Sequence, residues 1–208
     1  EKHDALLIAT GVYKPREIEI PGQNLKNIFP AMEFLTASNR KGLGETVKNF
    51  DNGILNAENK NVVVIGGGDT AMDCVRTAVR QNAKSVKCLY RRDKENMPGS
   101  TREVNNAEEE GVEFIWLSNP KKFIGSEKIS SVLVERMKLK DADSSGRKMP
   151  TPISNSNFEI KADLVIKALG FDPEDLPKLF NDPNLSVSKW GTIKINLKSM
   201  ETNIPGIF

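Results

Sequence analysis

The 208-residue sequence predicts an α/β fold in which a parallel sheet flanked by helices is joined to a three-stranded antiparallel meander. Three observations predict this. Residues 62–65 form a continuous apolar run that ends in a glycine turn and leads into a helical pattern. A second strand, residues 85–90, and a second helix repeat the alternation. After Gly111 the strands follow one another without helices, as in an antiparallel meander.

The first strand and helix have the pattern of a buried parallel unit. Residues 62–65 are all apolar, as expected for a strand that is covered on both faces. In the helix that follows, the apolar positions recur at helical spacing and form one stripe that can pack on the sheet. These positions are Ala71, Val75, Ala78 and Val79.

The later elements are predicted from capping and turn signals. Residues 100–103, Ser-Thr-Arg-Glu, form a capping box that opens the second helix, and Gly111 ends it. The meander strands are expected at residues 112–117, 131–139 and 158–160, with the turn-rich stretch 141–156 between the last two. A buried strand over residues 164–169 then ends at Gly170.

The start of the chain predicts three features before the first unit. Residues 5–9 have the pattern of a buried strand, a short helix is expected near Pro30, and residues 41–59 have the composition of a connection. The chain begins with Glu1 and closes on an apolar segment, residues 204–208. We therefore expect the sequence to be part of a longer protein.

Composition and charge exclude several classes of function. A net charge of +2 gives no overall attraction to nucleic acid or to membranes, and no apolar run reaches the roughly 20 residues needed to span a bilayer. We therefore expect no nucleic-acid partner, no membrane partner and a cytoplasmic setting. His3 is the only histidine, and Cys74 and Cys88 have the wrong spacing for a C-x-x-C pair. No metal site is predicted, and most hydrolase mechanisms are excluded.

The motif that carries chemistry has the form G-x-G-x-x-A and lies between a predicted strand and a predicted helix. Its residues are Gly66, Gly67, Gly68, Asp69, Thr70 and Ala71. Gly66 permits the sharp turn, Gly68 lets a phosphate approach the backbone, and Ala71 lets the helix pack closely on the strand. A phosphate would then face the free amides of the helix start. The motif predicts a Rossmann-like site for the pyrophosphate of a dinucleotide, and we take all six residues as candidate cofactor-binding residues.

Asp69 and Thr70 have two readings that the sequence leaves open. Both residues fall in the first turn of the predicted helix. They either cap the helix or contact the cofactor.

The end of the second strand favours NADPH over NADH. In sites for NAD, an acidic residue about 20 positions after the glycines bonds the ribose 2′-hydroxyl. Here Tyr90 is followed by Arg91 and Arg92, which can bind a 2′-phosphate through charge-assisted hydrogen bonds. Both arginines are candidate cofactor-binding residues, although an ordinary solvated strand end would have the same composition.

Four segments carry a resemblance to a known family: residues 66–74, 90–93, 96–100 and 109–112. Taken together, they closely resemble the small (beta) subunit of bacterial NADPH-dependent glutamate synthase. The resemblance covers nearly the whole chain. It implies a flavoprotein with two dinucleotide-binding domains, the NADPH domain being inserted into the FAD domain. Residues 1–45 would be a margin of the FAD-binding domain with a connection, 46–168 the NADPH-binding domain, and 169–208 a truncated return toward the FAD-binding domain.

The resemblance also implies a reaction. Hydride would pass from nicotinamide C4 to flavin N5, and electrons would then pass through iron–sulfur clusters to the large subunit, which makes glutamate from glutamine and 2-oxoglutarate. It adds Gly170, in the connection between the domains, to the candidate cofactor-binding residues. No catalytic acid or base is predicted. FAD and iron–sulfur clusters are expected only in the full-length protein, so this fragment should bind NADPH without turning it over.

Three alternatives remain. The chain could be the NADPH domain of another flavin and iron–sulfur reductase, of the ferredoxin-NADP transhydrogenase or dihydropyrimidine dehydrogenase type, or a non-catalytic nucleotide-binding module. Thioredoxin reductase is disfavoured because the sequence has no C-x-x-C pair. A one-domain NADP dehydrogenase would need an acid or base, and the two tyrosines, Tyr13 and Tyr90, do not favour one.

Overall fold

The computed structural model describes residues 3–142 and 148–208. It divides the chain into two compact units. The larger comprises Glu17–Gly170, and the smaller combines Glu1–Arg16 with Phe171–Phe208. The candidate nucleotide-binding residues all belong to the larger unit.

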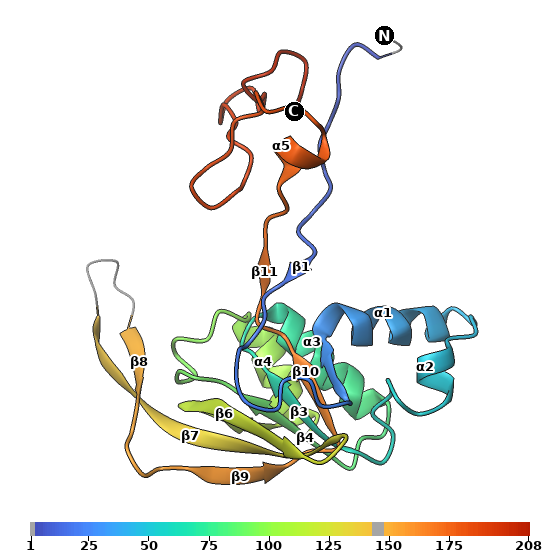
Figure 1. Cartoon of the computed structure of the whole chain (residues 1–208), viewed down its shortest axis with the longest axis vertical. Coiled ribbons are helices and arrows are strands. Elements are labelled where there is room, and N and C mark those ends of the chain that lie inside the picture. The colour runs from blue at the N-terminus through green and yellow to red at the C-terminus, as the bar shows by residue number, and fades with distance from the viewer. Residues whose placement is uncertain (1–2, 143–147) are drawn as a thin grey trace. The chain divides into compact units, whose positions relative to one another are not determined.

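A five-stranded parallel sheet forms the centre of the larger unit (Figure 1). Its strands lie in the order β2 (Ile28–Pro30), β10 (Leu164–Lys167), β3 (Asn61–Ile65), β4 (Ser85–Leu89) and β5 (Glu113–Ile115). Each neighbouring pair is parallel. All carboxyl ends therefore lie at one edge, where open α/β sheets bind ligands.

Helices cover one face of this sheet. They are α1 (Ala31–Gly42), α3 (Asp69–Arg80) and α4 (Thr101–Glu109), and the short α2 (Lys48–Asp51) follows α1. Phe34 of α1 and Met72 of α3 are fully buried in a cluster that includes Val62 and Val64 of β3. The predicted apolar stripe packs as expected, except that Val79 is only partly buried.

An antiparallel sheet covers the other face. It consists of β6 (Ser118–Gly125), β7 (Ile129–Ala142) and β8 (Lys148–Pro152), and β9 (Phe158–Lys161) also pairs with β7. Val63 and Ile65, which alternate with Val62 and Val64 along β3, are buried against its apolar side chains. The larger unit is therefore a three-layer structure, and the predicted α/β fold class is confirmed.

The antiparallel part differs from the prediction in its strands. The strand expected at residues 112–117 is β5, which joins the parallel sheet instead. The first antiparallel strand is β6, which the sequence did not suggest because it contains Pro120 and two exposed lysines, and its pairing with β7 is irregular beside that proline. With β8 inside the stretch expected to be turns, the antiparallel sheet has four strands rather than three.

The division into compact units also differs from the predicted boundaries. Residues 17–45, expected with the FAD-binding margin, belong to the larger unit. The reason is that β2 pairs with β10, and α1 buries Phe34 on the parallel sheet. The compact unit spans Glu17–Gly170, whereas the predicted NADPH-binding domain spans residues 46–168. The assignment of these segments to FAD-binding and NADPH-binding domains stays a prediction.

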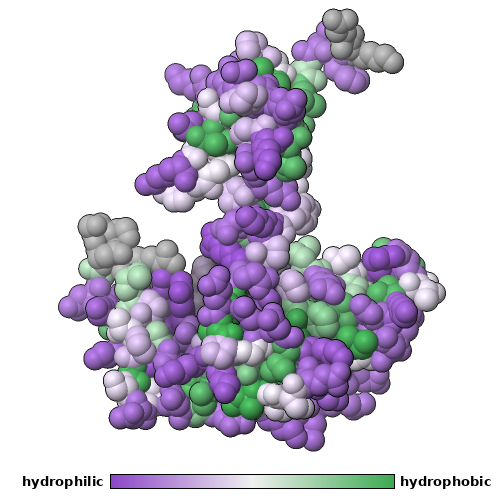
Figure 2. Space-filling view, in the orientation of Figure 1, coloured by the Kyte–Doolittle hydropathy of each residue, from purple (hydrophilic) through white to green (hydrophobic). Residues whose placement is uncertain are grey.

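The smaller unit has little regular structure. β1 (Lys14–Pro15) pairs with β11 (Phe171–Asp172), and the short helix α5 (Leu176–Leu179) follows. The buried strand expected at residues 5–9 is wrong: Leu6 and Leu7 are 54% and 74% exposed, and Leu6 forms only an isolated bridge to Ile207. Figure 2 shows apolar residues on the surface of this unit, where its own segments do not cover them.

No helix among the described residues has the length and apolar character needed to cross a membrane.

Candidate functional site

The glycine run lies at the carboxyl edge of the parallel sheet. Gly66 directly follows β3, and Gly68 precedes the first residue of α3. The amide of Gly66 donates to the carbonyl of Leu89 at the end of β4, at 3.1 Å. The turn therefore sits between the ends of two neighbouring strands, as the sequence predicts.

Gly66 is required by the packing of the protein itself. Its φ is +147°, in the region that side chains rarely adopt, and a Cβ there would lie 2.2 Å from the carbonyl oxygen of Ala168. Ala168 follows β10 and donates its own amide to Ile65 at 2.8 Å. Gly66 thus allows the β10 end to pass directly over the turn.

An aromatic ring fills the space that a side chain at position 67 would need, so Gly67 must be a glycine. A Cβ at Gly67 would lie 2.4 Å from the ring of Tyr90. That ring packs edge-on against Trp116, with centroids 6.3 Å apart, and its hydroxyl donates to the carbonyl of Asn96 at 2.9 Å. Sequence reasoning found no specific role for the middle glycine, because the ring of Tyr90 reaches it only in the folded sheet.

Gly68 differs from the other two glycines because a Cβ there would meet no atom within 4 Å. It is the N-cap residue of α3, and no side chain caps this helix start. The space on the Cβ side of Gly68 is therefore open, and the first turn of α3, which no side chain caps, carries the partial positive charge of the helix end. Within this turn, the amide of Ala71 donates to the carbonyl of Gly68 at 2.9 Å.

The next three residues of the motif have different environments. Ala71 is fully buried and lets α3 pack on the sheet. Thr70 is half-buried, whereas Asp69 is exposed and accepts a hydrogen bond from the amide of Ser100 at 2.8 Å. The carboxylate of Asp69 therefore contacts the start of α4.

The segment between β4 and α4 folds over the glycine run. The amide of Gly99 donates to the carbonyl of Gly67 at 2.8 Å. Within the segment, Oδ1 of Asp93 accepts from the amide and the side chain of Asn96, at 2.9 and 2.6 Å. Sequence reasoning missed this arrangement, although Asp93, Asn96 and Gly99 are residue types typical of turns.

The two candidate arginines have opposite environments. Arg91 is exposed. Arg92 is only 7% exposed, and its Nε has no hydrogen-bond partner among the described residues. The carbonyls on either side of Arg91, those of Tyr90 and Arg92, accept from Ser118 and Leu117 at 3.0 and 2.9 Å, which fixes the backbone at this strand end.

Both cysteines are buried beside the site rather than exposed in it. Cys88 donates its thiol hydrogen to the carbonyl of Gly66 at 3.4 Å. Burial raises the pKa of Cys88 to about 12, and burial also raises the pKa of Cys74 well above its usual range. Both thiols thus stay protonated near neutral pH, as expected for small core residues. Among the described residues, no group of three or more His, Cys, Asp or Glu could hold a metal ion.

Gly170 lies beyond the end of β10 with φ of +87°, three residues after Lys167. It follows Ala168, which contacts Gly66, so it is near the same edge of the sheet.

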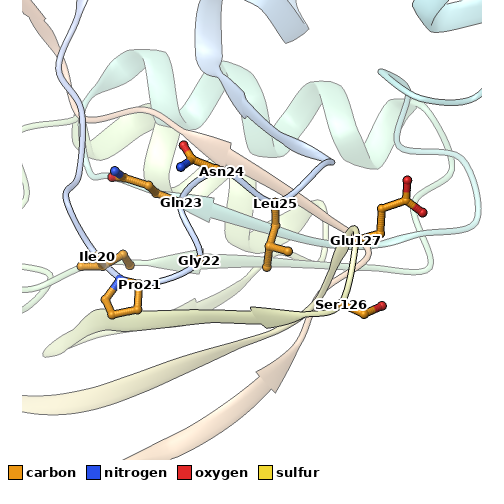
Figure 3. A pocket seen from close by; sticks show the side chains of 8 residues that line it. All are labelled: Ile20, Pro21, Gly22, Gln23, Asn24, Leu25, Ser126 and Glu127. Atoms are coloured by element: carbon orange, nitrogen blue, oxygen red, sulfur yellow. The ribbon is translucent and has the colours of Figure 1, made fainter.

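A hollow of about 460 Å³ lies elsewhere in the larger unit. Residues 20–25 and the β6–β7 turn line it (Figure 3). These residues precede β2, so the hollow lies toward the amino-terminal edge of the parallel sheet. It is thus at the opposite edge from the glycine run.

The whole chain, residues 1–208, matches the pyridine nucleotide-disulphide oxidoreductase family. The protein belongs to this family. Among curated relatives, it is 57% identical over 207 residues to the glutamate synthase [NADPH] small chain of Azospirillum brasilense, covering 100% of this chain and 43% of that protein. It is 55% identical over 207 residues to a putative glutamate synthase [NADPH] small chain of Cereibacter sphaeroides, covering 100% of this chain and 49% of that protein.

These identities confirm the resemblance found from the motifs, and the chain spans less than half the length of these two relatives. Among solved structures, FprA from Mycobacterium tuberculosis in complex with NADPH superposes with a TM-score of 0.73 at 17% identity, covering 100% of this chain and 57% of that chain. This likeness supports the fold.

Proposed function

We propose that this chain is the NADPH-binding part of an FAD-dependent oxidoreductase of the glutamate synthase small-chain type. In the whole protein, hydride would pass from NADPH to the flavin. Electrons would then pass through iron–sulfur clusters to a large subunit that forms glutamate from glutamine and 2-oxoglutarate. The names of the two relatives with 57% and 55% identity support the pathway, and a cytoplasmic setting fits it.

The observation that carries the proposal is the open, uncapped start of α3. The helix begins after the three glycines that follow β3, no side chain caps it, and a Cβ at Gly68 would meet no atom within 4 Å. A pyrophosphate seated there would accept hydrogen bonds from the first-turn amides and would be stabilised by the helix dipole. The sequence Gly66–Ala71 and this geometry both support a dinucleotide as the ligand.

Arg91 is our candidate for recognition of the 2′-phosphate. It is exposed at the end of β4, the strand next to β3, where a ribose bound beyond the glycine run would reach. A guanidinium can form two parallel bonds to a phosphate. Arg92 is 7% exposed, so we assign it to the support of this strand end.

The chain's own part in the reaction is to bind and orient the nucleotide. When bound, NADPH supplies the hydride and a flavin accepts it, so no acid or base of this chain is needed. Its two cysteines are buried and cannot form a four-thiolate cluster, so iron–sulfur clusters would be held elsewhere in the longer protein.

Calorimetric titration with NADPH and NADH tests the proposal. Wild-type protein should bind NADPH at least tenfold more tightly. Arg91→Ala should weaken NADPH binding by about 10- to 100-fold, because hydrogen bonds to charged groups contribute roughly 1.5–3 kcal/mol, and should leave NADH nearly unchanged. Arg40→Ala is the matched control, since Arg40 is an exposed arginine of α1 paired with Glu45.

Other outcomes would contradict parts of the proposal. Equal affinity for the two nucleotides in wild-type protein would remove the assignment of NADPH. Loss of the preference in Arg92→Ala but not in Arg91→Ala, with an unchanged melting temperature, would reverse the roles of the two arginines. Binding of neither nucleotide would reject the site.

A further inference from the structure

The start of α4 is completed by a residue of α3. Ser100 is the N-cap of α4, and its hydroxyl accepts from the amide of Glu103 at 3.4 Å. In a capping box, the carboxylate of Glu103 would return to the amide of Ser100. Instead, Glu103 pairs with Arg76, and the amide of Ser100 donates to Oδ1 of Asp69 at 2.8 Å.

This bond closes a segment over the glycine run. We call residues 93–100 the cover segment. At its far end, the amide of Gly99 donates to the carbonyl of Gly67 and the amide of Ser100 donates to Asp69, both at 2.8 Å. In its middle, the carbonyl of Asn96 accepts from the hydroxyl of Tyr90. At its near end it continues from Arg91 and Arg92.

The cover segment therefore connects the two halves of the proposed site. Its near end joins the strand end that carries Arg91, and its far end is bonded to the residues that open α3. The hydrogen bond from the amide of Gly99 to the carbonyl of Gly67 joins two backbone groups and does not depend on side-chain type. Asp69 supplies the one side-chain bond from the first turn of α3 to this segment among the contacts of the described residues.

We propose that Asp69 is a positioning residue that holds the cover segment on the glycine run, so that the α3 amides and Arg91 keep the spacing required by one NADPH molecule. This inference rests on the proposed function. The bond turns one oxygen of the Asp69 carboxylate to the start of α4. An acceptor atom, rather than a negative charge, is what the position requires.

Two substitutions at Asp69 separate the acceptor from the charge. Asp69→Asn keeps an oxygen that can accept from Ser100, whereas Asp69→Ala removes it. Asp69→Ala should weaken NADPH binding by about 3- to 10-fold, the range expected for one exposed hydrogen bond, and should weaken NADH binding less. Asp69→Asn should stay within about twofold of wild type, because an amide oxygen can make the same bond.

A matched pair at Ser100 tests the same bond from the donor side. Ser100 has φ of −62°, which proline adopts readily, so Ser100→Pro fits the φ of this residue while it replaces the amide hydrogen that bonds Asp69 with a ring carbon. Ser100→Ala removes only the hydroxyl. Ser100→Pro should reproduce the change in nucleotide preference of Asp69→Ala, and Ser100→Ala should not. This pair keeps the test open if Asp69→Ala does not fold.

A double-mutant cycle between Asp69 and Arg91 decides the mechanism. If Asp69 acts by holding the cover segment, which continues from the strand end that carries Arg91, Asp69→Ala should change the ratio of NADPH to NADH affinity in the wild-type background and not in the Arg91→Ala background. The inference is overturned if Asp69→Ala weakens both nucleotides equally, or if Asp69→Asn is as weak as Asp69→Ala. Wild-type protein that binds neither nucleotide would instead reject the proposed function.

Discussion

Two helices begin at the same edge of the parallel sheet, and they begin differently. α3 follows β3 after a run of glycines, and no side chain caps it. α4 comes after β4, and the hydroxyl of Ser100 caps it. The amide of Ser100 in turn donates a hydrogen bond to the carboxylate of Asp69. Both starts carry the positive end of a helix dipole, but of the two the α3 start has no side-chain cap, and the space on the Cβ side of its N-cap residue, Gly68, is open.

The capped start of α4 should contribute to stability, whereas the uncapped start of α3 should contribute to binding. At α4, the protein satisfies the start of the helix with its own groups, which stabilises the folded chain. At α3, no side chain satisfies the start of the helix, and we propose that the pyrophosphate of NADPH does so. Substitutions at the two starts should therefore have opposite signatures.

The largest effect is expected at Gly66, on stability. Gly66→Ala places a Cβ 2.2 Å from the carbonyl oxygen of Ala168 at φ of +147°. Strain and overpacking should lower the free energy of unfolding by about 2–4 kcal/mol or more. Urea denaturation measures this loss. A change below about 0.5 kcal/mol would show that the turn relaxes to accept a Cβ and that Gly66 is not required for stability.

Gly68→Ala should have the opposite signature, with weaker binding and nearly unchanged stability. Its Cβ would enter the open space at the α3 start, where we place the pyrophosphate. NADPH affinity should fall by about 10- to 100-fold as bonds to a charged group are lost, while the free energy of unfolding changes by less than about 1 kcal/mol. Calorimetry and urea denaturation give both quantities. Unchanged affinity would place the phosphates elsewhere.

At the α4 start, Ser100→Ala should lower stability without changing binding. Loss of the hydroxyl removes the N-cap bond to Glu103 and should cost about 0.5–2 kcal/mol of unfolding free energy. NADPH affinity should stay within about twofold. Thr101→Ala is a suitable control, because Thr101 is the exposed neighbouring residue inside the helix. A tenfold loss of affinity in Ser100→Ala would mean that both helix starts contribute to the site.

The smallest effect is a pH dependence of the contact between the two helices. The hydrogen bond from Arg76 of α3 lowers the pKa of Glu110, at the end of α4, below its usual value of 4.5, although burial acts in the opposite direction. Since the pKa is lowered on folding, this pair should contribute stability above about pH 4.5 and lose it as pH falls through the lowered value.

The matched variant for this effect is Glu110→Gln. The difference in free energy of unfolding between wild type and Glu110→Gln should be largest near neutral pH and shrink as the pH is lowered toward about 3. A difference that is independent of pH would show that the Arg76 bond does not depend on the charge of Glu110.

Local pattern determined much of the fold. The apolar run in β3 forms as predicted, and so does the stripe on α3 except for the partly buried Val79. Ser100 caps α4 as predicted, but the capping box is incomplete because Glu103 pairs with Arg76. The predictions were wrong at β6 and at residues 5–9 for the same reason: whether a strand forms depends on the strands that pair with it. Pro120 is untypical of a strand, yet β6 forms because it pairs with β7. Residues 5–9 are all apolar, yet among the described residues of their unit they form only the isolated bridge between Leu6 and Ile207.

The sequence by itself determined the glycine turn, its place between strand and helix, and the family resemblance, because these depend on residues that are adjacent in the chain. Only the tertiary structure decided which glycine faces open space, which arginine is exposed, and that Asp69 reaches Ser100. The physical reason is that burial and close contact are set by segments distant in sequence. Ala168 lies over Gly66 and the ring of Tyr90 lies against Gly67 only after the parallel strands have paired.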